Sequence, residues 1–133
     1  MAETGPPVAG QSIAWVYTYD LEATCAFYGQ KLGLPLALDQ GQCRLFRWSA
    51  NSFIGVCQVR PGRFVEPKGV VLTFVTPDVD GWHRHVIAQG ITPEAPPVLH
   101  AAFNVYSFFV LDPNGYRLEF QTFRDPAWDQ IVG

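Results

Sequence analysis

The sequence lacks the long apolar runs and basic clusters that mark several large classes of protein. No apolar segment approaches the roughly 20 residues of a membrane-spanning helix, and residues 1–11 lack the basic start and apolar middle of a signal peptide. We therefore expect a cytoplasmic protein that does not act at a membrane. The 9 Lys and Arg residues are scattered among 12 Asp and Glu residues, so we expect no nucleic-acid partner either.

Cysteine is also scarce, and its spacing indicates neither a zinc site nor a disulfide framework. Only Cys25, Cys43 and Cys57 are present, and none of them forms the Cys-x-x-Cys pattern that is typical of such sites. Thiols in the cytoplasm are generally kept reduced. We therefore expect all three cysteines to be reduced and to serve in packing.

What the sequence does contain is one order of elements that occurs twice. Residues 12–18 suit a strand, Asp20 can cap a helix, and a glycine ends that helix. Residues 69–76 suit a strand in the same way, Asp78 is the candidate cap, and another glycine follows the helix. Short strand-like stretches come after each helix, at residues 36–39, 43–48 and 52–59, and then around Pro93 and at residues 105–111 and 116–123.

This order predicts an α+β fold built from two βαβββ modules. The modules span residues 12–59 and 69–123, and together they form one domain of residues 12–123. The segment between them, residues 60–68, contains two prolines and a glycine and is interpreted as a linker. Two such modules would each supply a curved mixed sheet, and a cavity between the sheets would be a natural consequence.

Both ends of the chain are expected to be loose tails, at residues 1–11 and 124–133. Chain ends are generally poorly ordered unless something ties them down. Trp128 and Ile131 in the second tail are apolar side chains that could dock on another surface.

The most informative stretch is the turn sequence Asp-Pro-Asn-Gly at residues 112–115, between two apolar strand-like segments. Four turn formers in a row predict a hairpin. Glu119 lies in the returning strand, where two-residue alternation puts it on one face with Arg117 and Gln121. A carboxylate there is either a solvated strand residue or a site residue that a cavity, a partner or a cation accommodates.

At these residues the chain resembles the vicinal oxygen chelate superfamily, which contains glyoxalases, bleomycin-resistance proteins and extradiol dioxygenases. The matching stretches are residues 20–24 with 27–28, residues 32–34 and residues 112–119. The resemblance covers about residues 12–123 and implies the glyoxalase-like arrangement of two βαβββ modules around a cavity. Members of this superfamily carry out many different reactions, so the activity has to be argued from the site.

Metal-dependent members place four ligands on four strands, and this chain has a donor at only one of those positions. Carried over, the positions fall at Ile13, Val56, Val70 and Glu119. One carboxylate cannot supply the three or four protein ligands that a catalytic metal ion commonly needs. The resemblance therefore implies a site with no metal and no other cofactor. His83 and His85 fall outside these positions and are expected to be solvated helix residues.

In place of a metal site, alternation along the strands predicts an apolar and aromatic cavity. Ile13 would bring Trp15 and Tyr17 with it, Val70 would bring Leu72 and Phe74, and Ile54, Val56 and Gln58 would lie opposite Arg117, Glu119 and Gln121. The predicted ligand-binding residues are Trp15, Tyr17, Phe74, Tyr106, Arg117, Glu119 and Gln121. Such a lining suits an aromatic or cationic small molecule, although the same side chains could instead fill the cavity as core.

Two functions follow from this cavity. The first is a metal-free binding protein of the bleomycin-resistance type, which sequesters a small molecule as a homodimer. The second is a glyoxalase-like or dioxygenase-like enzyme, an isomerase or lyase in which Glu119 acts as acid, base or metal ligand, together with Tyr17, Tyr106 or His100. The catalytic candidates are Glu119 and His100. We favour binding, because the missing ligand positions remove the cation on which most chemistry of the family depends.

Overall fold

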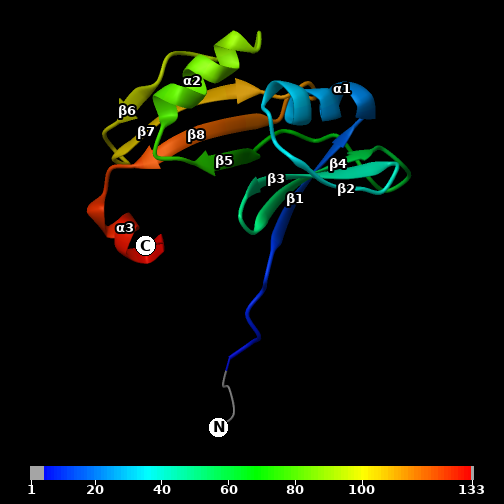
Figure 1. Ribbon diagram of the computed structural model, residues 1–133, viewed down its shortest axis with the longest axis horizontal. Coiled ribbons are helices and arrows are strands. Elements are labelled where there is room, and N and C mark those ends of the chain that lie inside the picture. The colour runs from blue at the N-terminus through cyan, green and yellow to red at the C-terminus, as the bar shows by residue number, and fades with distance from the viewer. Residues whose placement is uncertain (1–4, 133) are drawn as a thin grey trace.

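The computed structural model describes residues 5–132 and contains two four-stranded sheets of the same topology (Figure 1). The strand order is β1-β4-β3-β2 in the first sheet and β5-β8-β7-β6 in the second. In each sheet one pair of strands is parallel and the other two pairs are antiparallel. This repeat confirms the predicted α+β fold of two βαβββ modules. Of the predicted tails, residues 1–4 and 133 lie outside the described residues.

Most elements begin and end within two residues of their predicted positions. The first module consists of β1 (Ser12–Thr18), α1 (Leu21–Cys25), the π-helical segment η1 (Ala26–Lys31), β2 (Leu36–Asp39), β3 (Cys43–Ser49) and β4 (Ser52–Gln58). The second consists of β5 (Val71–Val75), α2 (Val79–Ala88), β6 (Val98–His100), β7 (Val105–Leu111) and β8 (Arg117–Phe123), and α3 (Pro126–Val132) follows it.

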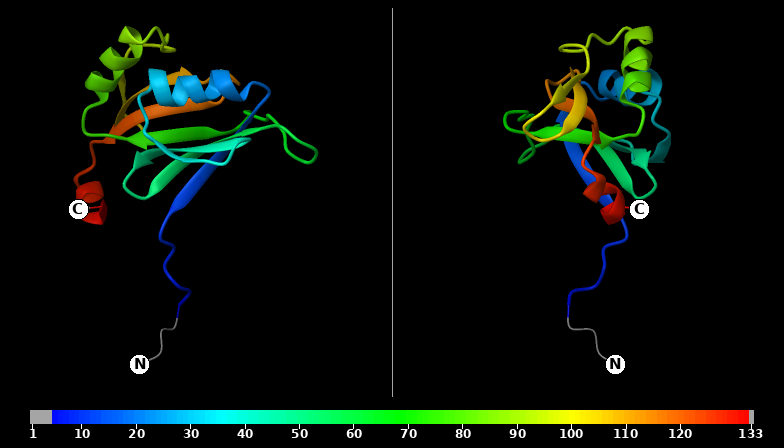
Figure 2. Two further views of the ribbon diagram at one scale, coloured as in Figure 1. Left: turned by 45° about the vertical axis from the view of Figure 1, so that its right-hand side comes forward. Right: turned by 90° about the vertical axis from the view of Figure 1, so that its left-hand side faces the viewer.

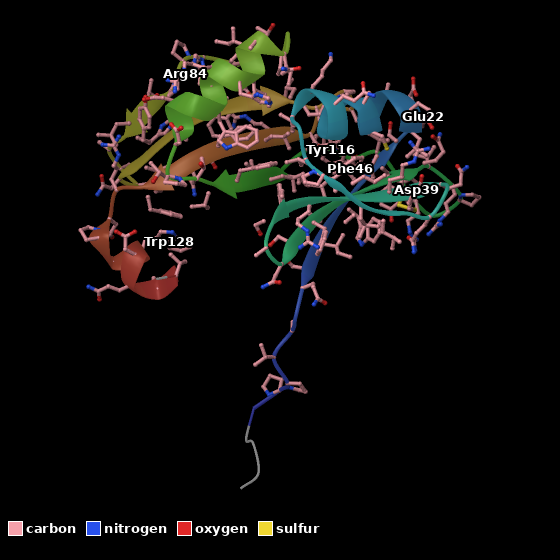
Figure 3. The ribbon with its side chains drawn as sticks, in the orientation of Figure 1. Glu22, Asp39, Phe46, Arg84, Tyr116 and Trp128 are labelled. Atoms are coloured by element: carbon pink, nitrogen blue, oxygen red, sulfur yellow. A yellow bond between two sulfur atoms is a disulfide. The ribbon has the colours of Figure 1, made fainter. Side chains whose placement is uncertain are left out.

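Two predictions about the second module and its tail were wrong. The strand expected around Pro93 begins at Val98, because residues 93–97 contain three prolines that cannot donate to a neighbouring strand. The tail expected to be loose at residues 124–133 contains α3, where the Trp128 ring packs on Phe123 with ring centroids 4.3 Å apart (Figure 3). No helix among residues 5–132 is both long enough and apolar enough to cross a membrane.

The two modules enter their helices in the same way. Asp20 and Asp78 each accept a hydrogen bond, through a side-chain oxygen, from the backbone N–H three residues on, at 3.1 and 2.9 Å. The threonines two residues before them, Thr18 and Thr76, accept from the N–H groups of the two aspartates at 2.9 and 3.1 Å. Both predicted caps are therefore confirmed, and residues of the two modules can be paired by counting from them.

The helices α1 and α2 cover the same side of the two sheets, and α3 lies on the opposite side (Figures 1 and 2). We call the side under α1 and α2 the helix face and the other side the open face. The core lies on the helix face, where Phe120 stacks with Phe74, Phe108 and Trp82 at centroid distances of 4.6, 5.0 and 4.9 Å. These rings fix α2 on β7 and β8.

The turn at residues 112–115 joins the second module to the helix of the first. The buried Tyr28 hydroxyl donates to Asp112 Oδ2 at 2.7 Å, and Asn114 exchanges hydrogen bonds of 2.9 Å with Thr18 and Thr24. Asp112 Oδ1 accepts from the N–H groups of Asn114 and Tyr116 at 2.8 and 2.9 Å. Burial raises the pKa of Asp112 and raises the pKa of Tyr28 well above its usual value. We call this network the closed junction.

The prediction that all three cysteines are reduced was wrong for two of them. Cys43 and Cys57 form a disulfide between β3 and β4, and Cys25 is the free, buried thiol. The β3–β4 register places the two residues directly opposite each other, with Cα atoms 4.1 Å apart. Pairing of this kind depends on strand register and leaves no trace in the spacing of cysteines along the chain.

The two helix histidines, predicted to be solvated, are partly exposed and also contact neighbours. His83 lies edge-on to Phe108, with ring centroids 5.1 Å apart. His85 Nε2 lies 2.9 and 3.1 Å from the carbonyl oxygens of Lys31 and Leu32 at the end of η1. His85 therefore links α2 to the end of the first module's helix.

Candidate functional site

Glu119 lies near the middle of the open face of the second sheet. The strand register places it between Thr73 on β5 and Phe109 on β7. Because successive side chains of a strand alternate between faces, Arg117 and Gln121 share this face with it, as predicted. The residue pattern supports the assignment, since the intervening Leu118 and Phe120 are completely buried on the helix face.

A cavity of about 380 Å³ opens beside Glu119. Its lining consists of His100, Phe103, Val105, Phe109, Glu119, Gln121 and Phe123. The two catalytic candidates named from the sequence, Glu119 and His100, therefore line one cavity. The sequence analysis missed the phenylalanines, although alternation along the strand opposite Glu119 would have placed Phe109 there.

The Glu119 carboxylate is half-buried and only partly satisfied by the protein. Thr73 Oγ1 donates a hydrogen bond to Glu119 Oε1 at 3.0 Å. No further group among residues 5–132 donates a hydrogen bond to this carboxylate, and no cationic side chain there forms a salt bridge with it. Glu119 therefore keeps acceptor capacity for a ligand.

Arg117, a predicted ligand-binding residue two positions before Glu119 on this face, forms its salt bridge elsewhere. Its Nε and Nη2 atoms donate to the two carboxylate oxygens of Glu94 at 2.8 and 2.9 Å. Its guanidinium carbon also lies 3.7 Å from the centroid of the Phe109 ring. The hydrogen bonds from Arg117 lower the pKa of Glu94, so this pair stays charged at neutral pH, and Arg117 forms its salt bridge with Glu94 and not with the cavity's own acid.

Trp15 and Tyr17 lie on the open face of the first sheet, as predicted, but not beside Glu119. The cavity beside Glu119 is not lined by Trp15 or Tyr17. The Trp15 side chain is 42% exposed, and its ring lies directly over Gly55, where any Cβ atom would collide with it. Gly55 therefore has a packing role that the sequence analysis did not identify.

Several side chains predicted to face the cavity lie on the opposite face. Trp15 pairs with Gly55 and Val16 with Val56, so Ile54, Val56 and Gln58 lie on the helix face together with Val16. Phe74 and Leu72 lie on the helix face of the second sheet, where Phe74 belongs to the core. The Tyr106 hydroxyl donates to Asp80 Oδ1 of α2 at 2.5 Å. A shift of one residue in the assumed register reverses every face, and this is what misplaced Val56 and Phe74.

The corrected register also moves the four positions at which metal ligands would lie. Glu119 pairs with Thr73 in the second module, and the equivalent pair in the first module is Gly55 with Trp15. The four open-face positions that match the metal ligands of the family are therefore Ile13, Gly55, Val71 and Glu119. Three of these four side chains have no donor atom. Within residues 5–132, no three or more His, Cys, Asp and Glu side chains come together in a group that could hold a metal ion. The donor set therefore does not fit a four-ligand metal site.

Comparison with known proteins gives one family and many similar folds. The model of the Glyoxalase/Bleomycin resistance protein/Dioxygenase superfamily matches residues 11–120. None of the curated proteins matches the chain.

Three solved structures illustrate the likeness in fold. A glyoxalase/bleomycin resistance protein/dioxygenase from Nocardioides is 21% identical, with a TM-score of 0.71 over 92% of this chain and 88% of that one. A lactoylglutathione lyase from Agrobacterium tumefaciens is 24% identical, with a TM-score of 0.69 over 88% and 95% of the two chains. An integron cassette protein from V. cholerae is 20% identical, with a TM-score of 0.68 over 90% and 98%.

Proposed function

The chain belongs to the Glyoxalase/Bleomycin resistance protein/Dioxygenase superfamily, and on that premise we propose that it binds a cationic aromatic small molecule without a metal. The binding site is the open-face cavity of the second module. The observation that carries this proposal is the half-buried Glu119 carboxylate, which among residues 5–132 has one hydrogen-bond donor, Thr73, and no salt bridge. A positively charged ligand would supply the missing partner.

The remaining lining supports an aromatic ligand. Phe103, Phe109 and Phe123 surround the carboxylate, and their rings can stack on a planar molecule or face a cation. Gln121 and His100 add hydrogen-bonding groups that can orient it. A volume of about 380 Å³ lies within the usual range for small-molecule sites.

We further propose that a second copy of the chain completes this cavity, in a homodimer. The open face of the first sheet exposes Ile13 and Trp15, and that of the second exposes Val71 and Val75, with exposed fractions between 42% and 48%. Apolar faces of this kind are unfavourable in water unless a partner covers them. Pairing the first module of one copy with the second module of another would bring Trp15 and Tyr17 to the cavity beside the other copy's Glu119.

Calorimetric titration with cationic aromatic dyes, chosen by a thermal-shift screen that includes divalent metals, tests the binding function. Glu119→Gln keeps the side-chain volume and removes the charge, so the dissociation constant for a cationic dye should rise by about one to two orders of magnitude. Glu66→Gln makes the same change at an exposed position and should leave the affinity unchanged. Equal affinities in all three proteins would contradict the proposal.

The shared cavity of Glu119 and His100 supports a second candidate function, a metal-independent isomerase or lyase. One group would remove a proton from a bound substrate and the other would return one. Turnover of a glyoxalase-type substrate that is lost in both Glu119→Gln and His100→Ala, with binding retained, would favour this enzyme over the sequestering protein. Binding without turnover would favour the latter.

The predicted cytoplasmic location remains a prediction. The Cys43–Cys57 bond makes it testable, because most disulfides are reduced in that compartment. Thiol labelling of protein from rapidly acid-quenched cells would report two reactive cysteines if the location is reducing and none at these positions if it is oxidising.

A further inference from the structure

The two modules meet at two places that internal symmetry makes equivalent, yet only one of them is closed. Counting from the caps Asp20 and Asp78 pairs Thr18 with Thr76 and Thr24 with Trp82. The turn at residues 112–115, which forms the closed junction, corresponds to the turn at residues 49–52. At the second place the structure has an open cavity of about 370 Å³ instead of a hydrogen-bonded contact.

The difference between the two places follows from the residue that lies four positions after each aspartate cap, which is Thr24 in the first module and Trp82 in the second. In the closed junction, Thr24 is small enough for the turn to approach, and its hydroxyl accepts a hydrogen bond from Asn114 at 2.9 Å. Trp82 takes that position in the second module, and Asn51, in the turn that corresponds to residues 112–115, is exposed and makes no side-chain hydrogen bond within the described residues. The indole ring therefore keeps the turn away and leaves a gap between the modules.

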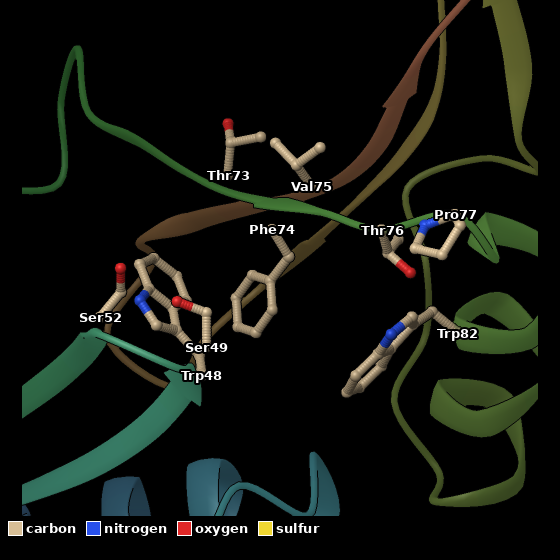
Figure 4. Close-up of a pocket in the computed structure, with 9 residues that line it drawn as sticks. All are labelled: Trp48, Ser49, Ser52, Thr73, Phe74, Val75, Thr76, Pro77 and Trp82. Atoms are coloured by element: carbon tan, nitrogen blue, oxygen red, sulfur yellow. The ribbon is translucent and has the colours of Figure 1, made fainter. Parts of the chain in front are cut away.

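The gap has the chemical character of a binding site (Figure 4). Trp48 and Trp82 lie on either side of Phe74, whose ring centroid is 4.3 Å from that of Trp48 and 6.0 Å from that of Trp82. The hydroxyls of Ser49 and Ser52 lie on the same wall as Trp48. No ionisable side chain is among the nine lining residues, so a charged ligand would lose its hydration without gaining a counter-charge.

The third wall of the gap is the unpaired edge of β5. This strand is the last in its sheet and pairs with β8 alone. Thr76 N–H donates to the backbone carbonyl oxygen of Gln121 in β8 at 2.8 Å, and backbone groups alternate in direction along a strand. The N–H and C=O groups of Thr73 and Val75 therefore point away from β8, toward the gap, and form a row of donors and acceptors.

We propose that this open junction is a second small-molecule site, which takes a neutral, planar, fused-ring heterocycle carrying a neighbouring N–H and C=O. The ring packs against the aromatic wall of Trp48, Phe74 and Trp82, and the N–H and C=O groups pair with the free edge of β5. A volume of about 370 Å³ accommodates a two-ring molecule. The site is separate from the Glu119 cavity, since β5 lies between them.

Titration with quinolin-2(1H)-one, a neutral two-ring lactam, tests the proposal by tryptophan fluorescence and calorimetry. The N-methyl derivative lacks the N–H donor, and naphthalene-2-carboxylate carries a charge, so each should bind at least tenfold more weakly. Absence of lactam binding at millimolar concentration, or equal binding of all three compounds, would overturn the proposal.

Variants then locate the bound probe. Trp82→Leu removes one stacking wall and should raise the dissociation constant of the lactam at least tenfold. Trp82 also packs on Phe120, so Ser52→Phe, which fills the gap and leaves the aromatic walls intact, should abolish binding independently of any loss of stability. Phe103→Leu, the matched change at the Glu119 cavity, should leave lactam binding unchanged. Binding that is lost in Phe103→Leu and kept in Ser52→Phe would place the probe in the other cavity and refute the second site.

Discussion

Replacing Tyr28 by Phe isolates the hydrogen bond that holds the modules together at the closed junction. The ring is completely buried, and its hydroxyl donates to Asp112 Oδ2 at 2.7 Å. Phe keeps the ring and its packing, so the change leaves one buried carboxylate oxygen without a partner. A hydrogen bond to a charged group contributes about 1.5 to 3 kcal/mol, and we expect a loss of that size in the free energy of unfolding at neutral pH.

The pH dependence of this loss is a sharper test than its size. Burial raises the pKa of Asp112, so the folded state binds a proton more readily than the unfolded chain does. This carboxyl therefore contributes stability below its unfolded pKa, and the contribution is lost as the pH rises through the folded pKa. The bond from Tyr28 lowers that folded pKa, so Tyr28→Phe raises it further. The loss in the free energy of unfolding that Tyr28→Phe causes should be largest near pH 8 and should become smaller toward pH 4.

Urea unfolding of both proteins at several pH values measures this difference. Tyr19→Phe is the matched control, because Tyr19 is 74% exposed and its hydroxyl makes no hydrogen bond with the described residues. A deficit below about 0.5 kcal/mol at pH 8, within the usual scatter for surface changes, would refute the assigned role of the bond. A deficit that stays constant from pH 8 to pH 4 would refute the role of Asp112 ionisation.

Three further predictions concern the rest of the fold. Gly55→Ala should displace the Trp15 ring and cost about 1 to 3 kcal/mol, which a change in tryptophan emission and urea unfolding would detect. Replacing both Cys43 and Cys57 by Ala should lower the free energy of unfolding by about 2 to 4 kcal/mol, and dithiothreitol should then have no further effect. Trp128→Ala should remove a ring contact worth about 0.5 to 1.5 kcal/mol and release α3, seen as faster amide exchange over residues 126–132 while the sheets keep their protection.

The strands and helices could be predicted because their signals are local. Asp20 and Asp78 mark helix starts through hydrogen bonds that span only three residues, and alternation marked β1 and β7 at their observed ends. The β6 strand was misplaced because Pro96 and Pro97, which cannot donate to a neighbouring strand, precede its first residue, Val98. Local chemistry therefore predicted the order of elements, and with it the two-module fold.

The faces of the strands and the cysteine pairing depend on register, which is not local. Val56 was assigned to the cavity, yet pairing with Val16 turns it to the helix face. The same kind of pairing places Cys43 opposite Cys57. The face that Glu119 shares with Arg117 and Gln121 could be predicted because alternation within one strand is local, whereas the pairing of β1 with β4 joins distant parts of the chain.

The difference between the two junctions can be traced to one pair of equivalent residues in the two modules. Aligning the two halves at their aspartate caps pairs Thr24 with Trp82, and this pairing is visible in the sequence. The structural consequence of this pairing is not visible there, because the sequence alone does not show that Thr24 contacts the turn of the other module. The structure shows that Asn114 is hydrogen-bonded to Thr24. The Trp82 indole at the equivalent position explains why the turn at residues 49–52 does not approach the helix and why a cavity remains there. A replacement of Trp82 by Thr would therefore be expected to let the turn close, at the expense of the proposed second site.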